Sequence, residues 1–85
     1  MNQEFATVIF KMQNKKVVDI EVPLNITAND LVVSLNEAYN LNIDTTDIKN
    51  CFFKAEQPIA LLRGNKSLRD FGVRNGTIVI FTEHV

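Results

Sequence analysis

The sequence predicts an α+β fold in which one helix crosses one face of a mixed sheet. Three observations carry this prediction. Two strand patterns open the chain around a polar turn, an apolar stripe at helical spacing follows them, and a segment of turn residues leads into a last apolar strand. A chain of 85 residues has room for one small core, so a single domain over residues 1–85 is expected.

The first two strands are predicted over Glu4–Met12 and Val17–Leu24, paired as an antiparallel hairpin. In the second strand, apolar residues alternate with the acidic Asp19 and Glu21. Alternation of period two is typical of a strand with one buried and one solvated face. Pro23 is expected to end this strand, because proline has no N–H to donate to a neighbouring strand.

A helix is predicted over Ala28–Asn40. Thr27 is a favourable N-cap, and Asp30 lies three positions further on, where an acidic side chain can complete a capping box. Asn40 is expected to end the helix, because asparagine tolerates the left-handed conformation. Apolar residues at helical spacing form the expected buried stripe, which consists of Ala28, Leu31, Val32, Leu35, Ala38 and Tyr39.

The rest of the chain is predicted to complete the sheet. A polar stretch is followed by a strand over Lys49–Ala55, a short strand over Ile59–Arg63, a helical turn over Leu68–Phe71 and a last strand over Thr77–Thr82. The side chains expected to meet in one core are Phe10, Ile20, Leu31, Leu35, Phe53, Leu68, Ile78 and Ile80.

This order of elements is the β-grasp arrangement, and the chain resembles ubiquitin over almost its whole length. The segment Leu-x-Asp-x-Gly-Val-x-Asn-Gly from Leu68 to Gly76, together with the small size, is similar to the bacterial YukD/EsaB family of ubiquitin-like proteins. That family accompanies type VII (WXG100, ESX-like) secretion systems of Gram-positive bacteria. The resemblance implies a noncovalent accessory or regulatory role, with a cytoplasmic part of a membrane secretion machine as the protein partner.

Two other functions fit the same fold. Ubiquitin-like modifiers and sulfur carriers end in Gly-Gly, whereas this sequence ends in Glu83-His84-Val85, so a modifier or sulfur carrier is the less favoured alternative. A generic ubiquitin-fold binding module of an unrelated complex is the other.

Catalysis and bound cofactors are not expected. The sequence holds one cysteine, Cys51, and one histidine, His84, too few for a Cys/His zinc site, and Cys51 is expected to be a buried, inert thiol. A net charge of −1 gives no general attraction to nucleic acid. No apolar run approaches the roughly 20 residues that span a bilayer, so direct membrane insertion is not expected and a cytoplasmic protein is predicted.

The predicted protein-binding site lies on two strands. If Cys51 and Phe53 point inward, Phe52 points outward, and if Ile78 and Ile80 point inward, Val79 and Phe81 point outward. Clustered exposed apolar side chains often mark an interface. There are two alternatives. The surface could form a weak homodimer, or the polar loop over 42–47 or the C-terminal tail could cover it. The predicted site is therefore Phe52, Val79 and Phe81, with Lys54 and Arg63 as its polar rim.

Overall fold

The computed structural model describes residues 4–82, so the expectations for His84 and the tail lie outside the described residues. Within this range the chain forms five strands, two α-helices and one 3-10 helix. In chain order these elements are β1 (Phe5–Lys11), β2 (Val17–Pro23), α1 (Ala28–Tyr39), η1 (Thr45–Asn50), β3 (Phe53–Glu56), β4 (Ala60–Leu62), α2 (Leu68–Phe71) and β5 (Ile78–Ile80).

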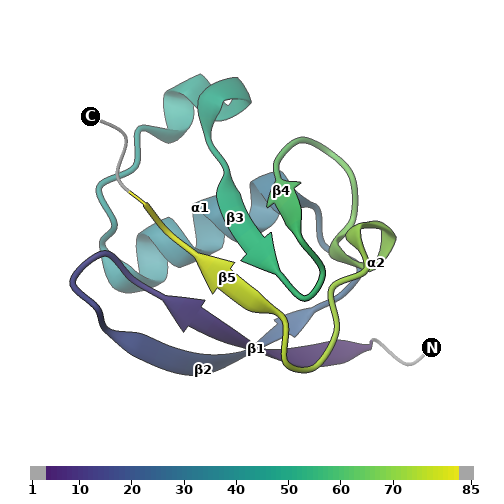
Figure 1. Cartoon of the computed structure of the whole chain (residues 1–85). Helices are drawn as coiled ribbons and strands as arrows, with labels where there is room; N and C mark the ends of the chain where they lie inside the picture. Colours follow the sequence, from purple (N-terminus) through teal and green to yellow (C-terminus); the bar gives the residue numbers. More distant parts are fainter. Residues whose placement is uncertain (1–3, 83–85) are drawn as a thin grey trace.

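The strands form one sheet in the order β2-β1-β5-β3-β4. The first and last strands, β1 and β5, pair in parallel at its centre, and the other neighbours pair antiparallel. Figure 1 shows α1 behind this sheet, crossing one face of it. The predicted α+β arrangement, a mixed sheet with one helix across one face, is confirmed.

Local hydrogen bonds explain where α1 begins and ends. The Thr27 hydroxyl accepts from the Asp30 N–H, and the Asp30 carboxylate accepts from the Thr27 N–H, both at 3.1 Å, which is the predicted capping box. Asn40 takes the predicted left-handed conformation, with φ of 52°. The buried stripe is shorter than predicted, because Ala38 and Tyr39 are exposed. The Tyr39 ring nevertheless packs 5.6 Å from that of Phe10.

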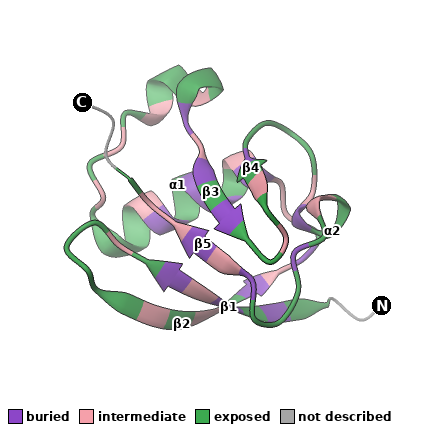
Figure 2. Ribbon diagram, viewed as in Figure 1, coloured by how far each residue is buried: buried purple, intermediate pink, exposed green. Residues whose placement is uncertain are grey.

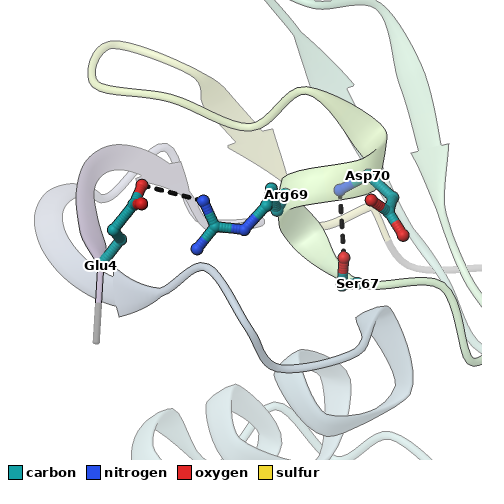
Figure 3. A network of polar contacts seen from close by, with 4 residues as sticks. All are labelled: Glu4, Ser67, Arg69 and Asp70. Carbon is teal, nitrogen blue, oxygen red and sulfur yellow. Dashed lines mark hydrogen bonds and ion pairs between the residues drawn. The ribbon is translucent and has the colours of Figure 1, made fainter. Parts of the chain in front are cut away.

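The closing segment holds β5 against β1. The Ser67 hydroxyl caps α2 by accepting from the Asp70 N–H at 3.1 Å, and Arg69 forms an ion pair of 2.9 Å with Glu4, the residue before β1 (Figure 3). The Asn75 side chain then accepts from the Thr7 N–H of β1 at 2.8 Å. These contacts fix the start of β5 beside the first strand.

The core lies between the sheet and α1. Alternate residues of β1 are buried, as are Phe53 and Ala55 of β3, and Figure 2 shows the same alternation of buried and exposed residues along β3. The predicted core residues Phe10, Leu31, Leu35, Phe53 and Leu68 are buried, whereas Ile20 packs at the margin of the core and remains partly exposed.

Two predictions about the second half of the chain were wrong. In β5, Ile78 and Ile80 are only partly buried and Val79 is 1% exposed. The pairing of β5 causes this, because Val79 lies opposite Phe10 of β1 and Ala55 of β3, both of which face the helix. The predicted third strand also begins later, at Phe53, because Asp44 caps η1 over residues that were assigned to a loop and a strand.

Candidate functional site

The face of the sheet opposite α1 carries a group of apolar side chains. Ile9, Ile78 and Ile80 are partly exposed, and Leu61 is 48% exposed. The pairing brings them together: Ile9 lies opposite Ile78, while Leu61 and Ile80 lie on either side of Lys54. Because cross-strand neighbours on one face of a sheet lie within contact distance, Ile9, Ile78 and Ile80 form one surface, which continues through Lys54 to Leu61. We call the area of surface around Ile9, Ile78, Ile80 and Leu61 the sheet patch.

Two lysines lie within this surface. Lys11 of β1 and Lys54 of β3 are both exposed and are both register partners of Ile80 in β5. Asp19 and Glu56 lie at the other end, beside Ile9 and Ile78 respectively. The end of the sheet patch around Ile80 is therefore apolar with positive charge, which suits a partner surface that is apolar and acidic.

The structure separates the residues of the predicted site. The outward orientation of Val79 was wrong, since its side chain lies in the core. Phe81 also faces the core side, where its ring meets that of Phe53 edge-on at 6.0 Å. Phe52 is partly exposed, and together with Phe81 it lines a pocket beside Leu41 rather than the outer face of the sheet.

Lys54 and Arg63 are both exposed, as a polar rim requires. Lys54 lies within the sheet patch, between Ile80 and Leu61. Arg63 follows β4, one residue beyond the buried Leu62. Whether any of the five predicted residues binds a partner stays a prediction.

The site predicted from the sequence did not include Ile9, Ile78, Ile80, Leu61 or Lys11. For Ile78 and Ile80 the missing information was the phase of β5, since the run Ile78-Val79-Ile80 is apolar at every position. Thr77, which has the same strand parity as Val79, favoured the wrong phase, because threonine is mostly an exposed residue. In the structure Thr77 is fully buried, and its hydroxyl is hydrogen-bonded.

Cys51 is placed as a structural thiol. Its side chain is 8% exposed, and its Sγ lies 3.4 Å from the carbonyl oxygens of both Asp44 and Asp47. Burial raises the pKa of the Cys51 thiol above its ordinary value, and the negative charges of Asp47 and Asp44 raise it further. Nucleophilic chemistry requires the thiolate, which this environment disfavours.

Cys51 is therefore expected to react slowly with a maleimide in the native protein at pH 8. A raised pKa means that less thiolate is present at this pH than for a free thiol, and burial restricts access to what remains. The rate can be followed by intact mass, with the same protein unfolded in urea as the control. Equal rates in the two states would contradict the assignment of Cys51 as a buried thiol.

Residues 4–82 contain neither a metal-binding cluster nor a helix that could span a membrane. No group of three or more His, Cys, Asp or Glu side chains is arranged to hold a metal ion. None of the helices in this range combines the length and apolar character needed to cross a membrane.

Solved structures with the same fold come from distant proteins. The C-terminal ubiquitin-like domain of mouse tubulin-specific chaperone e superposes with a TM-score of 0.71 at 14% identity, covering 100% of this chain and 94% of that one. A ubiquitin-like domain from Arabidopsis thaliana gives 0.69 at 18% identity, with 95% and 80% covered. The UBL domain of Plasmodium falciparum Dsk2 gives 0.62 at 20% identity, with 91% and 97% covered. The fold is ubiquitin-like.

Sequence comparison identifies the family. No match was found among curated proteins. The family model described as "WXG100 protein secretion system (Wss), protein YukD" matches residues 6–80, from the second residue of β1 to the last residue of β5. The match includes every strand and helix of the fold, and so the chain belongs to the YukD family of WXG100 secretion system proteins.

Proposed function

We propose that this protein is a noncovalent, non-enzymatic binding factor of a WXG100 (type VII) secretion system. In this proposal it acts in the cytoplasm and regulates or assists secretion by docking on a cytoplasmic part of the membrane machine. Membership of the YukD family supports the association with secretion. The observation that carries the binding role is the sheet patch, where Lys54 lies between the partly exposed Ile80 and the exposed Leu61.

The composition of the sheet patch favours one kind of partner surface. Apolar side chains on a sheet are already held in place, so a partner can cover them with little loss of conformational entropy in the sheet. Lys11 and Lys54 are exposed on both sides of Ile80, so they can pair with carboxylates while the isoleucines are covered. The favoured partner element therefore presents apolar residues alternating or interspersed with Asp and Glu.

The first test removes the apolar contacts. Ile80→Ala and Leu61→Ala are each expected to weaken binding about 30-fold if these residues are hot spots worth about 2 kcal/mol. Tagged protein would be captured from cells of the host that encodes it, and secretion-system components would be quantified by mass spectrometry. The dissociation constant of the recovered component would then be measured with purified proteins.

Matched variants control for loss of fold. Val33→Ala removes an equally apolar side chain from the exposed surface of α1, and it should leave binding unchanged. Urea unfolding must remain cooperative in every variant. The captured protein should also keep its intact mass, because a noncovalent complex leaves no adduct. Normal binding by both patch variants would refute the role of the sheet patch, and a covalent adduct to the partner would refute the noncovalent mode.

The second test reverses a charge. Lys54→Glu should weaken binding more at low salt than at high salt, since the salt-sensitive attraction is replaced by repulsion. Lys16→Glu makes the same change in the exposed hairpin turn and is expected to have a smaller effect. A partner that binds Lys54→Glu more tightly would carry basic residues, which would contradict the acidic partner proposed.

A further inference from the structure

A second, separate concavity lies at the end of the sheet where η1 and the chain after β5 meet. It is a pocket of about 300 Å³, and Figure 1 shows η1 and the end of β5 at the same side of the molecule. Apolar walls come from the loop after α1 and from two phenylalanines, and acidic residues of η1 and its cap complete the lining. Its lining includes Leu41, Ile43, Asp44, Asp47, Phe52 and Phe81.

The walls of this Phe52–Phe81 pocket are held in place by the fold. Leu41, Ile43 and Phe81 pack against the core. The loop is fixed by Asn36 of α1, whose side chain accepts from the Ile43 N–H at 2.8 Å and donates to the Ile43 carbonyl at 3.2 Å. A preformed wall loses little conformational entropy when a ligand binds.

The two carboxylates of the pocket can accept further hydrogen bonds. Asp44 accepts from the N–H and the hydroxyl of Thr46, and both bonds end on Oδ1. Asp47 accepts from the Asn50 amide at 2.8 Å on Oδ2. Within residues 4–82 the ion pair that forms is Arg69 with Glu4, so neither aspartate is neutralised by a basic side chain of the described chain. Burial raises the pKa of Cys51, which lines the same pocket, and the negative charges of Asp47 and Asp44 raise it further.

We propose that the Phe52–Phe81 pocket binds one arginine side chain of a partner protein. A volume of about 300 Å³ accommodates a single long side chain. The aliphatic stem of arginine would contact Leu41 and Ile43, its planar guanidinium would stack against an aromatic ring, and its donors would reach the carboxylates. Lysine lacks the planar fork, and an apolar side chain would cover the aspartates without pairing them.

This site does not depend on the function proposed for the sheet patch. The two surfaces differ in charge, since Lys11 and Lys54 lie in the sheet patch and Asp44 and Asp47 line the pocket. A partner that reaches both would need acidic residues for the first and arginine for the second.

The test uses nuclear magnetic resonance with a defined probe. Acetyl-Ala-Arg-Ala-amide would be titrated into ¹⁵N-labelled protein, with the glutamine and lysine analogues as controls. The arginine peptide is expected to shift the amide signals of residues 41–52 and of Phe81, and the lysine peptide to do so more weakly. Added salt should weaken the effect, because the attraction is partly ionic.

Variants locate the contact. Asp47→Asn keeps an acceptor for Asn50 but removes the charge, and it should weaken binding of the arginine peptide about fivefold. Asp19→Asn makes the same change on β2, in the outer face of the sheet, and should have no effect. Ile80→Ala should leave the peptide shifts unchanged, so this experiment fails or succeeds independently of the sheet patch.

Three results would overturn the proposal. The first is an equal response to the glutamine peptide, which would show that the charge is not recognised. The second is a set of shifts confined to residues outside the pocket. The third is a set of shifts of the pocket residues that grows with protein concentration in the absence of peptide, which would identify a second copy of this chain as the occupant.

Discussion

Replacement of Phe53 by alanine is expected to lower the free energy of unfolding by about 3–5 kcal/mol. Phe53 is 1% exposed, and its ring meets Phe10 at 5.6 Å and Phe81 at 6.0 Å, edge-on in both cases. The substitution removes these ring contacts and leaves a cavity between the sheet and α1. Small domains have a total stability near the lower end of about 5–15 kcal/mol, so the loss is a large share of the total.

Urea unfolding at equilibrium, followed by circular dichroism, measures this loss. Phe5→Ala is the matched control, because Phe5 begins the same sheet with its side chain 49% exposed. The control should change stability by less than about 1 kcal/mol. Similar losses in the two variants would mean that Phe53 does not form the centre of the core.

The parts of the fold that could be predicted are those for which neighbouring residues show either the solvated face of an element or the position of its end. Asp19 and Glu21 identify the solvated face of β2, and Thr27 with Asp30 fixes the start of α1. These signals reside in neighbouring residues, so no knowledge of tertiary contacts is needed. The closing turn was predictable in the same way, and Gly72 does take a left-handed conformation, with φ of 86°.

The parts that could not be predicted depend on pairing between distant strands. Every position of β5 is apolar, so its phase is set by contact of Val79 with Phe10 and Ala55 rather than by its own pattern. A phase error of one residue exchanges the two faces of a strand. That single error explains why the sequence placed Val79 in a binding surface and Ile78 and Ile80 in the core.

The same phase error accounts for Phe81, which has the strand parity of Val79 and faces the core side with it. Phe81 follows the last residue of β5, and there the chain leaves the sheet beside the loop that contains Leu41. The phenylalanines Phe52 and Phe81 do come together, as proposed from the sequence, but they line a pocket whose other walls come from that loop and η1. No local sequence pattern indicates a pocket formed between residues 41–52 and the distant Phe81.

Replacement of Thr77 by valine is expected to lower the free energy of unfolding by about 2–3 kcal/mol, although valine has nearly the same shape. Thr77 is fully buried. Its hydroxyl donates to the Gln57 carbonyl at 2.7 Å and accepts from the Arg74 N–H at 3.0 Å. Valine would leave both backbone groups without this partner, and removal of one partner costs more than the hydrogen bond itself contributes.

The Thr77 hydroxyl also connects two turns that are distant in the sequence, so its removal affects more than the immediate surroundings of Thr77. Its hydroxyl joins the turn before β4 to the turn before β5, and its carbonyl accepts from the Ile9 N–H of β1 at 2.9 Å. Thr77→Ser is the control, because it keeps the hydroxyl and removes one methyl group, at about 1 kcal/mol. Urea unfolding of both variants decides the matter. If valine proves as stable as serine at this position, the buried hydroxyl does not hold these turns together, and the start of β5 is fixed by the Asn75 side chain and by the backbone hydrogen bonds to β1.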